Sequence, residues 1–182
     1  ADRAGVKLRP ISPGLRTDKE KLYEINSLVS RFYHYILLNH KSAQSALNYL
    51  TKNRGLTLET IKAFQLGFSP DRPLALRSYI VDKKKNSIRD LERVGVVSIK
   101  DGRSFDRLRG RIIFPLFDHR GNVVGFAGRI LPSAGKSSLA KYINTPETEI
   151  YHKSKILYGL NLTKGEIKKK QEATVMEGEL DV

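Results

Sequence analysis

Cysteine and tryptophan are absent from this 182-residue chain, and methionine occurs once. Without cysteine the chain has no disulfide framework and no thiolate zinc site, which is typical of a reducing, intracellular setting. No stretch approaches the roughly 18 apolar residues of a membrane-spanning helix. The N-terminal letters ADRAGVKLRPISPG lack the apolar centre of a secretory signal, and the four histidines show no metal-ligand spacing. We therefore expect a cytoplasmic protein that binds neither zinc nor a membrane.

Acidic residues are also few. The chain has 19 Asp and Glu against 33 Lys and Arg, a net charge of +14 and a pI near 10.0. This excess favours a polyanionic partner, of which nucleic acid is the commonest, although a solvated basic surface would give the same composition. Residues 100–170 hold fifteen basic and six acidic residues. The lysine triplets 83–85 and 168–170 fall near predicted helix ends, where they more often face water or complement the helix dipole.

The periodicity of apolar residues changes from helical to strand-like along the chain. A long amphipathic helix is predicted over 18–40, and shorter helices at 43–52, from Thr57, at 75–82, at 87–93 and at about 160–170. A short strand is expected within FQLGFSP, and a hairpin pairs 112–117 with 123–130. Pro115 predicts an edge strand or a bulge there. The fold class is α+β, a helix-rich N-terminal part followed by a small mixed or antiparallel sheet.

The last ten letters, ATVMEGELDV, predict a further strand that ends at a pair of acidic residues. The apolar residues at 173–176 bring Glu177 and Gly178 to the strand end, and Asp181 follows. Such positions carry ligand-binding groups in open α/β sheets. Acidic residues beside glycine are also common in an ordinary strand-to-helix turn. These ten residues alone leave both interpretations open.

Four blocks in series resemble the bacterial DnaG-type DNA primases. They are RGLTLETIKAFQLGFSP, FDRLRGRIIFPLFDHRGNVVGFAGRIL, AKYINTPETEIYHKSKILYGL and VMEGELDV, which together span residues 54–182. The resemblance implies two parts. Residues 1–165 would form the basic, DNA-binding N-terminal subdomain of the primase core, and residues 166–182 would open a TOPRIM α/β domain that the chain leaves incomplete.

The resemblance also implies the activity of the intact protein. Primases are nucleotidyltransferases, DNA-directed RNA polymerases that make short RNA primers on a single-stranded DNA template from nucleoside triphosphates. Glu177 matches the TOPRIM glutamate, assigned to catalysis and metal binding, and Asp181 matches the acidic residue after it. Magnesium or manganese would be the cofactor, since carboxylates and phosphates are oxygen ligands. The paired aspartates that complete such a site are missing, so we expect this chain to be inactive alone.

The resemblance further implies where the protein works. The primosome assembles at the replication fork on the nucleoid, and a C-terminal module that this chain lacks would contact the replicative helicase. Family members usually carry an aromatic residue where this chain has Glu179, which would alter the turn after Gly178.

Nine residues are candidates for contact with nucleic acid: Arg107, Arg109, Arg111, Arg129, Lys141, Tyr142, Asn144, Lys153 and Lys155. The alternation of the first three predicts a row of guanidinium groups on one strand face, suited to phosphate oxygens. Ion pairs with Asp106 or Asp118 are the alternative. The Lys-Tyr-x-Asn block at 141–144 matches the family, which places it along the template or nucleotide path; a base could stack on Tyr142 while Lys141 meets phosphate.

Two other functions fit the same residues. A non-catalytic nucleic-acid-binding module would use the basic face alone, with Glu177 and Asp181 as helix-capping residues. A phage-type primase-helicase would use the same primase part beside a helicase motor. The Lys-Tyr-x-Asn and Arg-x-Arg blocks argue against a topoisomerase, because they belong to the primase subdomain.

Overall fold

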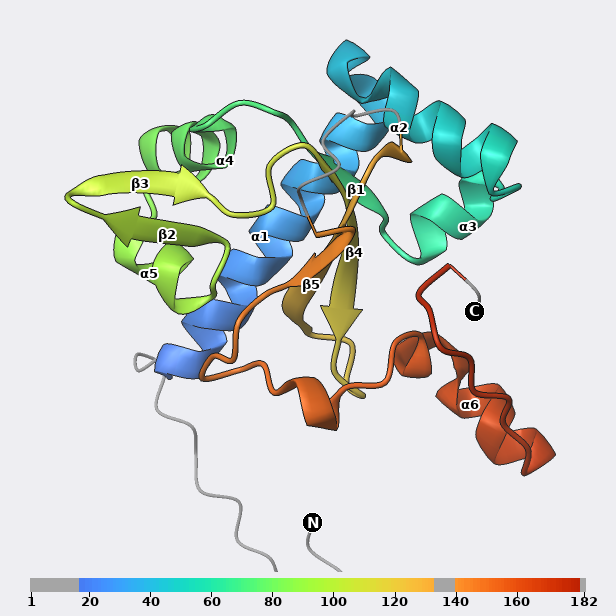
Figure 1. The fold of residues 1–182 in the computed structure, drawn as a ribbon. Helices are drawn as coiled ribbons and strands as arrows, with labels where there is room; N and C mark the ends of the chain where they lie inside the picture. The colour runs from blue at the N-terminus through green and yellow to red at the C-terminus, as the bar shows by residue number, and fades with distance from the viewer. Residues whose placement is uncertain (1–16, 133–139, 181–182) are drawn as a thin grey trace, which may run out of the picture.

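The computed structural model describes residues 17–132 and 140–180. Helix α1 (Asp18–Asn39) runs diagonally behind the central sheet in Figure 1. It begins at a capping box: Thr17 Oγ1 accepts from the Glu20 N–H at 3.3 Å, and the Glu20 carboxylate accepts from the Thr17 N–H at 2.9 Å. The predicted helix over 18–40 is confirmed. None of the described helices is long and apolar enough to cross a membrane.

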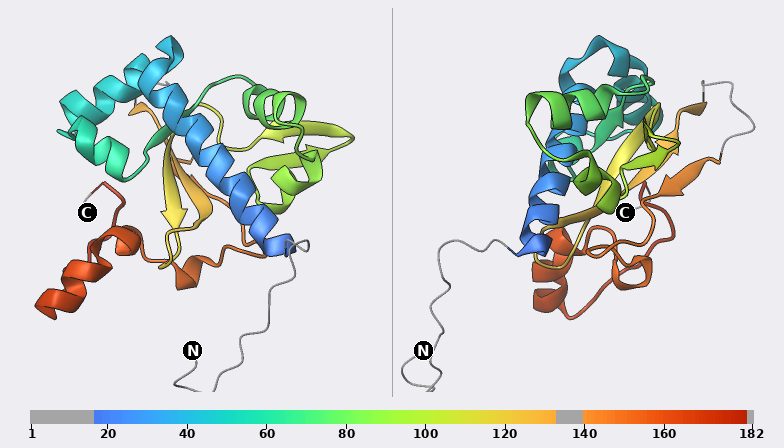
Figure 2. Two further views of the ribbon diagram at one scale, coloured as in Figure 1. Left: turned by 180° about the vertical axis from the view of Figure 1, so that it is seen from behind. Right: turned by 90° about the vertical axis from the view of Figure 1, so that its left-hand side faces the viewer.

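The other helices are short, and all but η6 lie close to predicted positions; α6 lies apart from α1 in Figure 1 and in the left view of Figure 2. They are η2 (Lys41–Ala43), α2 (Gln44–Asn48), η3 (Tyr49–Asn53), α3 (Leu58–Ala63), α4 (Ala75–Arg77), η4 (Ser78–Lys83), α5 (Ile88–Arg93), η6 (Lys153–Lys155) and α6 (Leu160–Lys170). Thr57 caps α3, as expected, because its Oγ1 accepts from the Thr60 N–H at 3.1 Å. The α-helices expected at 43–52 and 75–82 each end in a π-helix, η3 and η4.

Two antiparallel sheets follow. The central sheet has the strand order β1 (Gly67–Ser69), β4 (Arg111–Phe117), β5 (Val123–Ile130) and β6 (Tyr142–Asn144). The second sheet is the ribbon of β2 (Val97–Lys100) and β3 (Arg103–Asp106). The predicted hairpin is confirmed as β4 and β5, and the α+β class is confirmed with it. In Figure 1 the β2–β3 ribbon lies with α4 and α5 on one side of α1, and α2 and α3 lie on the other.

Strand β4 is a central strand over part of its length and an edge strand at Pro115. Strand β1 pairs with β4 only from Arg111 to Ile113, so Pro115 lies beyond the end of β1 and pairs with Phe126 of β5 alone. Its missing N–H therefore costs no ladder hydrogen bond. The expected bulge lies next to it, between Leu116 and Phe117.

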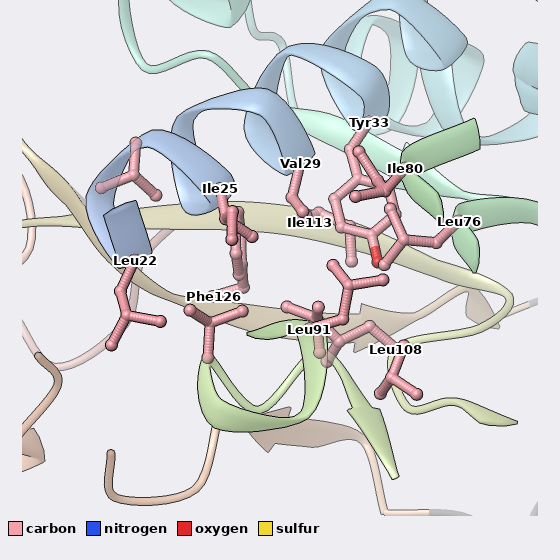
Figure 3. Close-up of a cluster of buried hydrophobic side chains, with 14 of the residues drawn as sticks. Leu22, Ile25, Val29, Tyr33, Leu76, Ile80, Leu91, Leu108, Ile113 and Phe126 are labelled. Atoms are coloured by element: carbon pink, nitrogen blue, oxygen red, sulfur yellow. The ribbon is translucent and has the colours of Figure 1, made fainter. Parts of the chain in front are cut away.

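The core lies on both sides of β4. Figure 3 shows side chains of α1, among them Val29 and Tyr33, pointing into the same space as Ile113 and Phe126, and all four are fully buried. The alternate residues Ile112 and Phe114 belong to a second cluster. Since neighbouring residues of a strand point to opposite faces, both faces of β4 are covered, which explains its uninterrupted apolar run.

A single glycine sets the distance between α1 and the sheet. A Cβ at Gly67 would lie 2.6 Å from Tyr33 Cβ and 2.8 Å from the Tyr33 carbonyl carbon. We expect Gly67→Ala to lower the free energy of unfolding by roughly 1–3 kcal/mol, because helix and strand must separate. Gly165→Ala is the control: Gly165 is in α6 with nothing within 4 Å of such a Cβ, so this change should be neutral or stabilising. Denaturant unfolding of both variants checks the prediction, which fails if Gly67→Ala matches the wild type.

The terminal strand does not form. Residues 172–176 have no regular secondary structure, and 177–180 form a bend and turn. A strand needs a hydrogen-bonded neighbour, and none of the described strands pairs with this segment. Without one the apolar side chains stay exposed, Val175 by 70% and Met176 by 53%.

Candidate nucleic-acid interface

The three arginines expected in one row lie on different kinds of backbone. Arg107 and Arg109 are in the turn between β3 and β4, and Arg111 is the first residue of β4. Gly110 has a φ of +69°, and its N–H donates to the Ser69 carbonyl at 2.9 Å. The chain therefore turns before it enters β4, and the prediction of one strand face for all three is wrong.

Arg107 and Arg109 are exposed. Arg109 Nε lies 2.9 Å from Asp71 Oδ1, so an ion pair does form, but with neither of the two aspartates that the sequence suggested. Pairs of this kind on a surface contribute about 0–1 kcal/mol, so a phosphate can replace the carboxylate. The Arg107 side chain has no hydrogen bond or ion pair within residues 17–132 and 140–180.

Arg111 is buried, with 5% of its surface exposed. Its Nη1 donates to three backbone carbonyls, at 3.3 Å to Gly128, 3.0 Å to Ala140 and 3.3 Å to Lys141. Burial lowers the pKa of Arg111. These bonds tie the backbone just before β6 to β4, which carries Arg111, and to β5, which carries Gly128. Arg111 therefore anchors the Lys-Tyr-x-Asn segment and does not present its guanidinium to solvent.

Arg129 is also 5% exposed and lies between two tyrosine rings. Its Cζ is 5.3 Å from the centre of the Tyr49 ring and 5.2 Å from the centre of the Tyr142 ring. Its Nη1 donates to the Tyr142 hydroxyl at 2.5 Å, whereas its buried Nε has no hydrogen-bond partner among the described residues. Cation–π contacts contribute about 0.5–2 kcal/mol each, which offsets part of the cost of burying the charge.

The Lys-Tyr-x-Asn segment lies on the edge strand β6. Lys141 precedes the strand and is exposed, and Tyr142 and Asn144 are its first and last residues, both half-buried. The exposed Lys141 thus directly precedes a tyrosine whose hydroxyl accepts a hydrogen bond from Arg129. An exposed cation next to a held aromatic ring can meet a phosphate and an unpaired base of the same strand.

A cleft of about 440 Å³ lies beside the other end of β6. Asn144, Lys153 and Glu177 all line it, together with residues of α6. Lys153 and Lys155 are exposed on η6, where the Glu147 carboxylate fixes the start of the turn by accepting from the Lys153 N–H at 2.9 Å. The cleft thus brings three of the predicted residues together at one place.

Glu177 is exposed at the rim of this cleft, and Asp181 lies outside the described residues. The segment is nevertheless packed on the domain: Leu180 contacts the second core cluster. Burial, with a smaller contribution from the Glu179 charge, raises the pKa of Tyr158. The departure at Glu179 therefore leaves the turn docked.

The described residues do not form a complete metal site. In residues 17–132 and 140–180, no three or more His, Cys, Asp or Glu side chains gather so that they could hold an ion. Glu177 could supply one oxygen ligand, but the described residues alone do not complete a magnesium site.

Tyr49 is the residue that the sequence did not reveal. It falls within the helix predicted at 43–52, and nothing in its spacing separates it from a core side chain. Its contact with Arg129 joins η3 to β5. The two residues are 80 positions apart in the chain (129 − 49), and no local pattern in the sequence reports such a contact.

The lysine triplets lie where the sequence predicted. Residues 168–170 form the last turn of α6, and Lys83 ends η4. The six lysines are exposed. Lysine at a helix C-terminus complements the dipole, so these runs are explained without a ligand.

Solved structures place this fold among the catalytic cores of primases. The RNA polymerase domain of Mycobacterium tuberculosis primase DnaG matches with a TM-score of 0.80 at 31% identity, over 88% of this chain and 51% of that one. The same domain in complex with double-stranded DNA matches with a TM-score of 0.81, at 31% identity, over 89% and 50%. A DnaG primase catalytic domain bound to ssDNA matches with a TM-score of 0.70, at 34% identity, over 81% and 44%.

Sequence comparison identifies the family. Residues 32–164 match the model of the DNA primase catalytic core, N-terminal domain, and the chain belongs to this family. The DNA primase of Geobacillus stearothermophilus is 40% identical over 190 residues, which cover 100% of this chain and 31% of that protein. The DNA primase of Synechocystis is 33% identical over 191 residues, with 100% and 29% coverage. The chain thus spans about a third of the length of these relatives.

Proposed function

We propose that this chain supplies the template-binding surface of a DnaG-type DNA primase. The intact protein, we infer, is a nucleotidyltransferase that makes RNA primers on single-stranded DNA for replication. Family membership supports the activity, and the DNA named with the solved relatives supports the template. The primer, the nucleoside triphosphates, the helicase and the location at the replication fork belong to the same proposal.

The observation that carries this proposal is the way β6 is held. Two buried arginines fasten it: Arg111 binds the backbone before the strand, and Arg129 binds the Tyr142 side chain. Lys141 stays exposed beside them. Buried charges are costly, and here two of them support one short edge strand that carries an exposed cation and an aromatic ring. Such an arrangement suits a single strand of nucleic acid.

The division of the chain is part of the proposal. Residues 1–165 would be the DNA-binding subdomain, and residues 166–182 would begin the TOPRIM domain. The family match, which ends at residue 164, supports this boundary. Helix α6 crosses it without a single buried residue in the described structure, as suits an element that joins two parts.

Glu177 is proposed as the first carboxylate of the catalytic centre, with Asp181 as a second ligand for Mg²⁺ or Mn²⁺ in the intact protein. When bound, the ion would activate the attacking hydroxyl and stabilise the charge on the phosphorus. Support comes from the position of Glu177 in the cleft that Lys153 and Asn144 also line. Since the described residues bring no three potential metal ligands together, we expect no primer synthesis by the 182-residue chain alone.

A salt-dependent titration with single-stranded DNA tests the template surface. We expect Lys141→Glu to weaken binding roughly tenfold and to reduce the slope of log affinity against log salt by about 0.7, the loss of one phosphate contact. Lys168→Glu makes the same charge change on an exposed lysine of α6 and should leave the slope unchanged. Fluorescence anisotropy of labelled oligonucleotide measures both.

Circular dichroism shows whether both variants are folded. If Lys141→Glu and Lys168→Glu weaken binding equally, the charge acts without a defined site and the proposed surface is wrong.

A further inference from the structure

Among the described residues, the arginine between the two rings has neither an acidic partner nor a full set of hydrogen bonds. Arg129 forms no ion pair with any described residue, and its buried Nε has no hydrogen-bond partner there. A buried cation without a carboxylate needs another source of stabilisation. The Tyr49 and Tyr142 rings, at 5.3 and 5.2 Å, are that source. The contacts with Tyr49 and Tyr142 therefore help to hold the Arg129 guanidinium group in place.

Tyr49 is itself held by a second arginine, Arg54. It opens the π-helix η3, in which the Arg54 N–H donates to the Tyr49 carbonyl at 3.1 Å. The wide turn brings the Arg54 side chain back over the ring: its Nε donates to the Tyr49 hydroxyl at 2.8 Å, and its Cζ lies 5.5 Å from the ring centre. π-helical turns often occur at functional sites because they redirect side chains in this way. Arg54, Tyr49, Arg129 and Tyr142 thus form a continuous series of contacts, which we call the stack.

We propose that Tyr49 is a positioning residue for the nucleic-acid interface: through the stack it holds Tyr142, and with it the exposed Lys141, in the orientation that receives an unpaired base and its phosphate. This proposal rests on the proposed function of β6. Tyr49 is half-buried behind Arg129 and needs no contact with the nucleic acid. Its effect is pre-organisation, since a ring and a cation already held in place lose less conformational entropy on binding.

The salt dependence of DNA binding distinguishes a residue that positions other side chains from a residue that contacts a phosphate. Removal of a phosphate contact reduces the salt slope by about 0.7, whereas loss of pre-organisation weakens binding at every salt concentration by the same factor. We expect Tyr49→Leu in the 182-residue chain to weaken binding of an oligo(dT) strand about tenfold with the slope unchanged. Tyr49→Phe keeps the ring over Arg129 and should restore most of the affinity. Lys141→Ala should reduce the slope.

A double-mutant cycle tests whether Tyr49 acts through Tyr142. If Tyr49 acts through Tyr142, Tyr49→Leu should weaken binding much less when Tyr142 is already Leu than when Tyr142 is present. Tyr49→Met, which fills a similar volume without an aromatic ring, replaces Tyr49→Leu if the latter unfolds, as judged by circular dichroism and the melting temperature.

The outcomes separate the two proposals. Wild-type affinity in the folded Tyr49→Leu or Tyr49→Met variant, alongside weak binding by Lys141→Ala, overturns the role of Tyr49 and leaves the template surface in place. A reduced salt slope in the Tyr49 variant overturns positioning in favour of direct contact. Wild-type affinity in the Tyr49 and Lys141 variants alike overturns the template surface itself, and the role of Tyr49 with it.

Discussion

Glu177→Gln is expected to abolish primer synthesis in a chain extended to the length of its DNA primase relatives. Glutamine keeps the shape of the side chain but has no negative charge, so it neither accepts a proton nor attracts a cation. Loss of such a group lowers rates by at least about 10²-fold. Affinity for single-stranded DNA should not fall, because the removed charge is negative. Primer synthesis on a single-stranded template, assayed beside the binding titration, separates the two effects.

Glu166→Gln is the matched control. Glu166 is exposed on α6 and lines the same cleft as Glu177, and it forms a surface contact with Lys169 at 4.0 Å. If charge in the cleft mattered in general, both variants would lose activity. Catalysis by Glu177 requires that Glu166→Gln remain close to wild type, and an active Glu177→Gln enzyme would end the assignment.

Elements that depend on nearby residues could be predicted from the sequence. The capping box at Thr17 and Glu20 marks the start of α1, and the cap at Thr57 marks α3. The β4–β5 hairpin is visible because two apolar runs flank a short polar turn. In each case the residues that decide the structure lie within a few positions of one another, so the pattern is complete in the sequence.

The candidate site depends on contacts between residues that are far apart in the chain, and the spacing of residues in the sequence does not reveal them. Arg107, Arg109 and Arg111 have the parity of one strand face, yet the turn that ends at Gly110 separates them. Arg111 and Arg129 appear as surface cations in a basic chain, and their burial arises from carbonyls and rings brought in by β6 and η3. The apolar run at 173–176 has strand composition, but pairing needs a neighbour, and composition does not supply one.

Asp106 is the buried carboxyl group with the largest expected effect on stability. It ends β3 with 7% of its surface exposed, and its Oδ2 accepts from the Leu76 N–H at 2.9 Å. Its Oδ1 is buried and has no hydrogen-bond partner among the described residues. Burial raises the pKa of Asp106 to about 6 from 3.8, although the backbone amides of 75–77 and the Arg109 charge act in the opposite direction.

The sign of the effect follows from proton binding. Between the unfolded pKa of 3.8 and the folded pKa of about 6, the folded state keeps a proton that the unfolded state has lost. Stability from this group is therefore complete below the lower value and is lost as the pH rises through the higher one. At 1.36 kcal/mol per unit, the loss between about pH 4.5 and pH 7 is roughly 2 kcal/mol.

Asp106→Asn should remove this pH dependence. The amide oxygen can still accept from the Leu76 N–H, and no charge forms at any pH. We expect the variant to gain about 2 kcal/mol relative to wild type as the pH is raised from about 4.5 to 7, in urea unfolding at a series of pH values. Asp101→Asn, in the exposed turn between β2 and β3, is the control and should follow the wild-type curve. If the curves of unfolding free energy against pH are parallel for Asp106→Asn and wild type, Asp106 is ionised throughout this pH range. The backbone amides of 75–77 would then stabilise its buried charge more strongly than desolvation destabilises it.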